Sequence, residues 1–203
     1  MRLLLTGLIL CLAHSADPTL TAEWRQARAA YYKGIQGDSI AYEQADQLFS
    51  RLYQEHPDIP LIEAYYGSLR LIKASHTWAL WEKGSLSKQG IALMNCAVAA
   101  QPDNLEIRFL RAATFYHLPA FFHLRQQSKK DFAYLAKVAV QAARTGRLEP
   151  SLAAASLYFH GIFLEEAGKT KLAVDNWQRT IDVAPTSPAA LGARKKLKEL
   201  ERE

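Results

Sequence analysis

Three consecutive residues near the C-terminal end, Gly168-Lys169-Thr170, have the types and the order with which a phosphate-binding P-loop ends. In such a loop the lysine binds the nucleotide phosphates and the hydroxyl binds Mg²⁺. The template also requires a glycine five residues before Gly168, and position 163 is Phe163. The residues before Gly168 have a helical pattern rather than that of a β-strand. We therefore interpret Gly168 as the left-handed residue that ends one helix, with Lys169 and Thr170 in the turn to the next.

Other residues that could do chemistry form no recognisable catalytic or metal-binding pattern. The sequence has no HExxH motif, no GxSxG motif and no paired cysteines. His117 and His123 are six residues apart across Pro119, a spacing that does not by itself place two metal ligands on one helix face. Cys96 lies on an apolar helix face, which favours a buried, inert thiol. We expect no enzyme activity, no cofactor and no metal.

The N-terminus has the pattern of a secretory signal peptide. Met1 and Arg2 precede an apolar run at residues 3–12, and small residues follow at the spacing that signal peptidase reads. The run is about half the roughly 20 residues that a membrane-spanning helix needs, and no later segment is that long without charge. We expect residues 1–16 to be removed and the mature chain to be periplasmic or secreted, without stable membrane insertion. An acylated Cys11 is the alternative, although Leu10 before it is large.

The charge and cysteine content exclude two further classes. Lys and Arg number 25 against 20 Asp and Glu, without a basic stripe, so the chain does not resemble a nucleic-acid binder. Loss of the leader would leave Cys96 as the only thiol, so no intramolecular disulfide could form. Stability must therefore come from packing.

The elements that position these residues are predicted to be helices. Segments rich in Ala, Leu, Gln, Glu, Lys and Arg have apolar residues three and four apart and are separated by Gly and Pro. A proline marks the first position of four predicted helices: Pro18, Pro60, Pro150 and Pro188. Two pairs with capping-box spacing mark two more helix starts: Asp103 with Glu106, and Ser128 with Asp131.

A recurring spacing relates these helices to one another. Gly161 is followed by Ala173 after twelve residues, Trp177 after four more and Pro185 after eight more. This spacing resembles the tetratricopeptide repeat, a helix–turn–helix unit of 34 residues. The second-helix part recurs elsewhere, at Ala45, Phe49 and Pro57 and, more weakly, at Gly90, Met94, Ala97 and Pro102. Small residues in such a unit let two helices approach, the aromatic fills the space between them and the proline ends the second helix.

The resemblance implies an all-α fold, a tetratricopeptide-like superhelix of antiparallel helix pairs with a C-terminal capping helix. Residues 17–203 then form one domain, divided into repeat units and a cap: about 18–57, 60–102, 104–146, 151–185, and 188–202. The first unit departs from the pattern, with Lys33 at the expected glycine and Gly34 beside it. Gly67 and Gly90 are eleven residues further apart than the pattern requires, which predicts a first helix about three turns longer than usual.

The third unit contains a proline that should interrupt its first helix. Pro119 lacks a backbone N–H and clashes with the preceding turn. We expect that helix to end or kink near Leu118, with a short aromatic stretch before the chain restarts at Ser128.

Aromatic and cationic residues are concentrated in the middle units. In a tetratricopeptide array the first helices of successive units line a concave groove, so the resemblance implies that these segments are neighbours facing it. The candidate residues for this groove are Tyr65, Tyr66, Arg70, His76, Trp78, Trp81, Arg108, Arg111, Tyr116 and His117. Most aromatics of a helical solenoid are core residues, and Arg108 and Arg111 can pair with internal acids; the candidates are Glu63, Glu106 and Asp131.

Two functions remain open from the sequence. The leading hypothesis is an exported adaptor or scaffold that holds a peptide or an envelope-protein partner in the groove. The alternative is a module that binds a small amphipathic anion, with arginines as forked donors and aromatics against an apolar body. An open, elongated groove would favour the first. An enclosed pocket with an arginine that no internal acid engages would favour the second.

Overall fold

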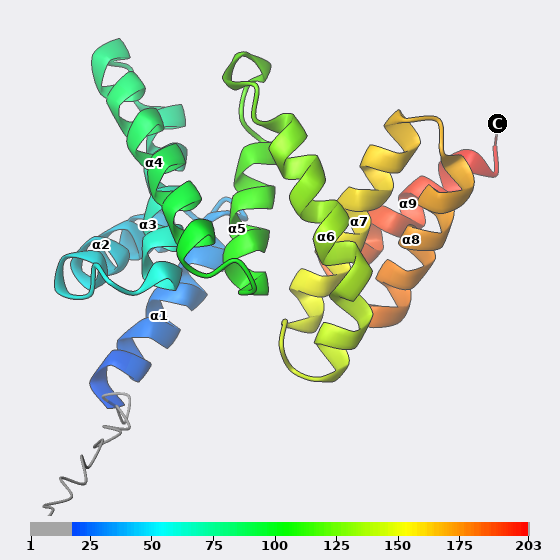
Figure 1. The fold of residues 1–203 in the computed structure, drawn as a ribbon, viewed down its shortest axis with the longest axis horizontal. Helices are drawn as coiled ribbons and strands as arrows, with labels where there is room; N and C mark the ends of the chain where they lie inside the picture. The colour runs from blue at the N-terminus through cyan, green and yellow to red at the C-terminus, as the bar shows by residue number, and fades with distance from the viewer. Residues whose placement is uncertain (1–17, 203) are drawn as a thin grey trace, which may run out of the picture. The chain divides into compact units, whose positions relative to one another are not determined.

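The computed structural model describes residues 18–202, and every regular element in this part of the chain is helical (Figure 1). The elements are α1 (Pro18–Gly34), α2 (Ser39–Glu55), α3 (Pro60–His76), α4 (Leu80–Ala100), α5 (Leu105–Tyr116), the 3₁₀ turn η1 (Ala120–Phe122), α6 (Arg125–Arg144), α7 (Pro150–Glu166), α8 (Thr170–Val183) and α9 (Pro188–Leu200). The all-α prediction is confirmed for these residues. The predicted signal peptide, residues 1–16, lies outside them.

Three helices begin at prolines that mark helix starts in the sequence. Pro60 opens α3, Pro150 opens α7 and Pro188 opens α9. The first helical position has no use for a backbone N–H, and proline supplies the helical φ. These three predictions are confirmed. Pro18 is the first described residue of α1, so a helix start there stays a prediction.

The two predicted capping boxes are not the helix caps. Asn104, the residue after Asp103, caps α5. Its side-chain oxygen accepts a hydrogen bond from the Ile107 amide at 3.2 Å. Helix α6 begins at Arg125, so Ser128 lies inside it. The Ser128 hydroxyl instead donates to the Ala112 carbonyl at 2.7 Å, which links α6 to α5. Glu106 accepts a hydrogen bond from the Tyr65 hydroxyl, and Asp131 accepts hydrogen bonds from Arg108 and Arg111, so these acids are used in contacts between helices.

The described helices fall into two compact units that divide within α2. The first ends at Leu48 and contains α1 and the start of α2. In it, a Cβ added to Gly34 would lie 2.7 Å from the Tyr42 Cα, so Gly34 provides the close approach that the repeat pattern expects one residue earlier. The second unit begins at Phe49 and contains the end of α2 together with α3 to α9.

Helices of the second unit pack as successive neighbours. Helix α3 packs on α4, α5 on α6 and α7 on α8, while α3 also contacts α5, α5 contacts α7, and α7 contacts α9. Figure 1 shows α6, α7, α8 and α9 gathered side by side at the C-terminal end of the chain. This succession of packed neighbours is consistent with a helical repeat. The finer assignment to the tetratricopeptide class and the division of residues 17–203 into repeat units stay predictions.

The residues that carry the repeat spacing meet in the α7–α8 pair. Trp177 and Ala173 on α8 are fully buried. A Cβ added to Gly161 on α7 would lie 2.4 Å from the Trp177 Nε1, so only glycine admits the indole here. The same nitrogen donates to the Tyr158 carbonyl at 3.2 Å. The predicted packing roles of glycine, alanine and tryptophan are confirmed in this pair.

The expected elongation of the first helix in the second pair is wrong. Helix α3 has 17 residues, as α1, α2 and α7 have, and the longer helix is α4, with 21. A Cβ on Gly90 would lie 2.6 Å from the Gly67 carbonyl oxygen, so these glycines mark where α3 and α4 cross. The number of residues between Gly67 and Gly90 gives the total length of chain beyond the crossing. It does not say how that length is divided between the end of α3, the link and the start of α4. The links at 77–79 and 167–169 are equally long, so the extra residues beyond the crossing lie in the last turns of α3 and the first turns of α4.

The interruption predicted at Pro119 is confirmed, and the restart is earlier than expected. Helix α5 ends at Tyr116, two residues before Leu118. The connection contains the 3₁₀ turn and His123, whose φ is 56°. Helix α6 then begins at Arg125 rather than at Ser128.

The turn between α7 and α8 explains the Gly168-Lys169-Thr170 sequence. Gly168 has φ 71°, in the left-handed region. The Lys169 amide donates to the Leu164 carbonyl at 2.9 Å and the Gly168 amide to the Glu165 carbonyl at 2.8 Å, the two bonds of a Schellman motif. Helix α8 starts at Thr170. The tripeptide ends one helix and leads into the next, as the sequence predicts.

Among residues 18–202, none of the helices combines the length and the apolar character needed to cross a bilayer.

Candidate functional site

The two segments that carry the candidate residues are neighbours. The Tyr65 hydroxyl on α3 donates to the Glu106 carboxylate on α5, and further along both helices the Ser68 and Thr114 hydroxyls lie 2.9 Å apart. The second contact lies closer to the C-terminal end of both helices than the first does, so α3 and α5 run parallel. The expected proximity of these helices is confirmed, but Tyr65 is fully buried between them and presents no surface to a ligand.

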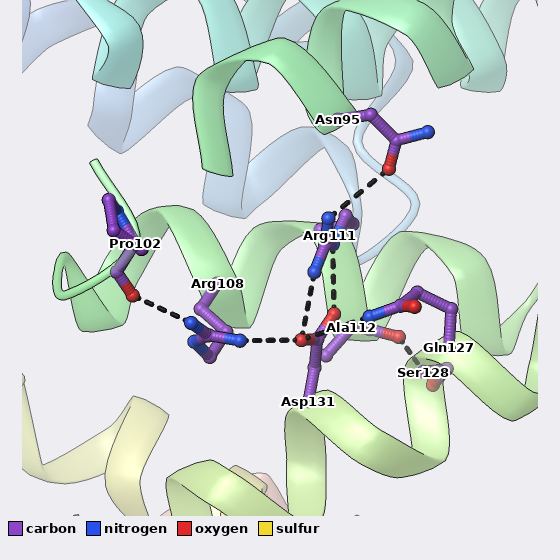
Figure 2. Close-up of polar contacts among 8 residues, drawn as sticks. All are labelled: Asn95, Pro102, Arg108, Arg111, Ala112, Gln127, Ser128 and Asp131. Carbon is purple, nitrogen blue, oxygen red and sulfur yellow. Dashed lines mark hydrogen bonds and ion pairs between the residues drawn. The ribbon is translucent and has the colours of Figure 1, made fainter. Parts of the chain in front are cut away.

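Arg108 and Arg111 converge on one buried carboxylate (Figure 2). Arg111 donates from Nε and Nη2 to the two oxygens of Asp131 at 2.9 Å each, which is the forked geometry of an arginine–carboxylate pair. Arg108 Nη1 donates to Asp131 at 2.9 Å, and its Nη2 donates to the Pro102 carbonyl at 2.7 Å. Arg111 also donates to the Asn95 side chain on α4 at 3.2 Å.

This cluster joins α4, α5 and α6. The Asp131 side chain is 1 % exposed, and hydrogen bonds from two guanidinium groups replace the water that it loses on burial. The Arg108 guanidinium also lies 4.3 Å from the centre of the Tyr134 ring. Of the three acids that the sequence allows as partners, the structure selects Asp131. Both arginines therefore bind Asp131 on α6, although Arg108 also donates to Pro102 and Arg111 to Asn95. Among the described residues the buried Arg108 Nε has no hydrogen-bond partner.

Tyr66 and Arg70 form a second group, on α3. The Arg70 guanidinium lies 4.5 Å from the centre of the Tyr66 ring, one helical turn away. The Tyr66 ring also stacks on that of Tyr53 at the end of α2, with 4.6 Å between the ring centres. Tyr66 is half-buried and Arg70 buried. The sequence identified the first two residues and missed Tyr53.

Glu63 lies one turn before Tyr66 on α3. Burial raises the pKa of the Glu63 carboxyl, and burial followed by the Glu63 charge raises the pKa of Tyr53. The Tyr53–Tyr66 stack is therefore flanked by an acid that is more easily protonated than in water.

Tyr116 and His117 belong to a third group, directed at α7 rather than at α3. The Tyr116 ring centre lies 4.7 Å from that of Phe159 and 5.6 Å from that of Phe163. The Arg125 guanidinium lies 4.7 Å from the centre of the Tyr116 ring. Contact with the Tyr116 and Phe159 rings removes water from the imidazole, and this desolvation lowers the pKa of His117.

The sequence did not single out Phe159, Phe163 or Arg125. A signal was present, because the two phenylalanines are four residues apart and so share one face of α7. The pattern alone does not say which aromatic on a neighbouring helix they meet.

His76, Trp78 and Trp81 lie at the turn between α3 and α4, and all three are exposed. Trp78 is in the link and Trp81 is the second residue of α4, so neither lies on the first helix of the pair. The ten candidate residues therefore occupy separate places: the α3–α5 contact, the Asp131 cluster, the two aromatic groups and this turn.

One further sequence prediction can be compared with the geometry. Cys96 is exposed on α4, so the expected burial of this thiol is wrong. Within residues 18–202, no three His, Cys, Asp or Glu side chains are grouped closely enough to hold a metal ion.

A hollow of about 410 Å³ lies away from all ten candidates, where α6 ends, α7 begins and α8 ends. It is lined by Val140, Ala143, Arg144, Pro150, Arg179, Asp182 and Val183. Two arginines, Arg144 and Arg179, line the hollow. The Arg179 guanidinium lies 3.7 Å from the carboxylate of Asp175 on the same helix. The sequence did not predict this hollow.

Comparison of the chain with family models, with curated proteins and with solved structures gave no match.

Proposed function

We propose that the chain is an exported, tetratricopeptide-like adaptor that binds a peptide or an envelope-protein partner. The observation that carries this proposal is the succession of contacts from α3 to α5, from α5 to α7 and from α7 to α9. In helical repeat proteins the helices that are neighbours in this way form one extended face, and that face binds polypeptides. The repeat spacing centred on Gly161 and Trp177 supports the class assignment.

Two partly exposed tyrosines on these helices suit the contact with a polypeptide. Tyr66 on α3 and Tyr116 on α5 are each held by a guanidinium, that of Arg70 and that of Arg125. An aromatic ring fixed in this way offers a large amphipathic surface and loses little side-chain entropy when a partner binds. We assign Tyr66 and Tyr116 to the partner-binding face.

The arginine pair favours this proposal over the small-anion module. Asp131 engages both Arg108 and Arg111, so an anion would have to displace a buried carboxylate to reach their forked donors. The hollow of about 410 Å³ has none of the ten candidate residues in its lining. A small-anion site built on Arg108 and Arg111 therefore has little geometric support.

Site-specific photo-crosslinking in the native host tests the proposal. A photoreactive phenylalanine at Tyr66 or Tyr116 keeps the aromatic ring, and the same residue at Lys137 on α6 or Gln178 on α8 gives a matched control on exposed second-helix positions. We expect one discrete polypeptide adduct at Tyr66 and Tyr116 and none at the controls. Adducts of equal yield at all four positions, or adducts of small-molecule mass only, would contradict the proposal.

Export is tested separately, from the N-terminus of the protein recovered from its host. The leader pattern predicts that the mature chain starts near Ala16 or Asp17. N-terminal sequencing should find one of these residues. Recovery of a chain that still starts at Met1 would refute export by this route and would leave the partner-binding proposal to be judged by crosslinking.

A further inference from the structure

Three apolar side chains at the α3–α4 turn stand almost wholly outside the packed helices. Trp78 is 97 % exposed, Leu80 79 % and Trp81 82 %. Trp78 lies in the three-residue link and the other two open α4. Apolar groups of this size gathered on one turn mark a contact surface, because soluble proteins seldom leave such groups in water.

The α5–α6 connection carries a second apolar tip. Phe121 is 71 % exposed, and its ring centre lies 4.5 Å from that of Phe122. His123, which follows, is the one non-glycine residue with positive φ in the described part of the chain. A side chain is rarely held in this region without a structural requirement. The connection therefore has a defined bend where it presents Phe121.

The two tips lie on the same edge of the second unit. Helices α3 and α5 run parallel, as the Tyr65–Glu106 and Ser68–Thr114 contacts show, so the turns that follow them emerge on the same side. Figure 1 shows the first turn of α4 and the η1 connection both at the upper edge of the view. We call Trp78, Leu80, Trp81 and Phe121 the apolar edge.

The segments that carry the apolar edge are rich in basic residues. Residues 77–88 and 117–130 contain five Lys and Arg residues and one acidic residue, Glu82. Lys83 and Lys88 on α4 are exposed, as is Lys130 on α6. Arg125 is paired with Glu166 of α7. The edge therefore combines projecting aromatic rings with an excess of positive charge.

We propose that the apolar edge binds the surface of an anionic lipid bilayer. Trp78, Trp81 and Phe121 enter the boundary between headgroups and acyl chains, which aromatic side chains prefer. The lysines bind the anionic headgroups, and the combination of apolar and basic residues is that of proteins that lie on a membrane without crossing it. The partner-binding residues Tyr66 and Tyr116 are not part of this surface, so the inference goes beyond the proposed function.

The shape of the edge favours a bilayer over a protein partner. The tips are two separate turns, and their aromatic side chains project from the packed helices, with Trp78 97 % exposed and Phe121 71 % exposed. A protein partner would need two pockets matched in position and depth, since interface cores have close shape complementarity. A fluid bilayer interface accepts separate projecting rings without such matching, and its negative charge complements the lysines.

Vesicle co-sedimentation with the full chain tests the proposal. The probes are vesicles of phosphatidylcholine alone and of phosphatidylcholine mixed with phosphatidylglycerol. The test variants are Trp78→Ser with Trp81→Ser, and Lys83→Gln. The control combines Leu191→Ser on α9, an exposed leucine, with Arg147→Gln in the α6–α7 turn at the other ends of the helices. The apolar run at residues 3–12 is common to all these chains, so differences among them report on the edge.

We expect binding to the mixed vesicles that weakens with salt. The tryptophan pair should weaken it about tenfold or more and Lys83→Gln about fivefold, whereas the control should bind as the parent does. Thermal unfolding should be unchanged in the tryptophan variant because both side chains are exposed. Absence of binding to mixed vesicles, or equal binding by parent and tryptophan variant, would overturn the proposal. The proposal would also be overturned if the tryptophan variant lost self-association of the chain and kept its binding to vesicles.

Discussion

At the scale of single residues, Asp131 is the charge on which the contact between α5 and α6 most depends. Its 1 % exposed side chain accepts hydrogen bonds from Arg108 and Arg111. We predict that Asp131→Ala lowers the free energy of unfolding by about 3–5 kcal/mol, because it leaves two guanidinium groups without their carboxylate. Urea denaturation measures this loss.

Asp175→Ala is the matched control for that variant. Asp175 faces Arg179 at 3.7 Å with a 62 % exposed side chain, and a surface pair of this kind contributes about 0–1 kcal/mol. If Asp131→Ala kept the stability of the parent and gained affinity for phosphate, the arginines would be a ligand site that Asp131 merely occupies. That result would restore the small-anion alternative.

Gly161 gives a second residue-scale prediction. A Cβ there would lie 2.4 Å from Trp177 Nε1 and 2.8 Å from Cδ1, and the indole is fully buried. Gly161→Ala should lower the free energy of unfolding by about 1–2 kcal/mol, since overpacking outweighs the gain in helix propensity.

Gly84→Ala in α4 should have the opposite effect. A Cβ there meets nothing within 4 Å, so only the propensity gain of up to about 1 kcal/mol remains. Thermal unfolding of the two variants side by side decides the point. Equal shifts in Tm would show that Gly161 is not kept for packing.

Some residue roles could be predicted from the sequence and others could not. The roles of Gly161 and Trp177 followed from their spacing, because glycine and a large aromatic at that distance have few other uses. The partner of Arg111 did not follow, since three acids were compatible with the pattern and only the fold brings Asp131 to it. Exposure of Trp78 and Cys96 was equally beyond the pattern, because an apolar residue near a helix end can face the core or the solvent.

At the scale of elements, the turn between α7 and α8 depends on Gly168. Its φ of 71° costs an L-residue roughly 1–2 kcal/mol. Gly168→Ala should therefore destabilise the protein by about that amount, whereas Lys169→Ala, at an exposed position, should have little effect. Calorimetry measures both. Detectable ATP binding by the parent that Lys169→Ala abolishes would contradict the interpretation of the tripeptide as a turn.

Packing of α7 on α8 also makes the stability depend on pH. Burial lowers the pKa of His160 below its ordinary value of 6.5, and the hydrogen bond with Asn176 offsets only part of this effect. The unfolded chain then binds more protons than the folded chain at a pH near 6.5 and just below it. The free energy of unfolding therefore falls as the pH falls from 6.5 toward the lowered pKa of His160. His117 acts in the same direction.

We predict that His160→Gln, which keeps a hydrogen-bonding group and does not titrate, loses less stability than the parent between about pH 7.5 and about pH 5.5. Denaturation curves at both values provide the comparison. A variant with the same loss as the parent would show that His160 is not the group responsible.

Helix boundaries were predicted better where a residue has one role. Pro60, Pro150 and Pro188 each open a helix, because the missing N–H is tolerated there and the φ is preset. The capping boxes were less informative, since Ser128 and Asp131 were used for contacts with α5. The length of α4 was missed because Gly67 and Gly90 fix where α3 and α4 cross and do not say which helix carries the extra residues.

At the scale of the whole molecule, the all-helical class followed from periodicity and punctuation. The sequence did not predict which side chains lie together, since the ten candidate residues lie in several places. We therefore propose different roles for them: stability for Arg108 and Arg111, partner binding for Tyr66 and Tyr116, and membrane contact at the apolar edge for Trp78 and Trp81.

The central claim, that this is an exported adaptor for a polypeptide, is tested most directly by native mass spectrometry of the protein after mild crosslinking in its host. We predict a complex with a second polypeptide, in which the chain itself has lost the mass of about its first sixteen residues. A chain that carries only a small bound molecule, or that stays a bare monomer despite crosslinking, would contradict the claim.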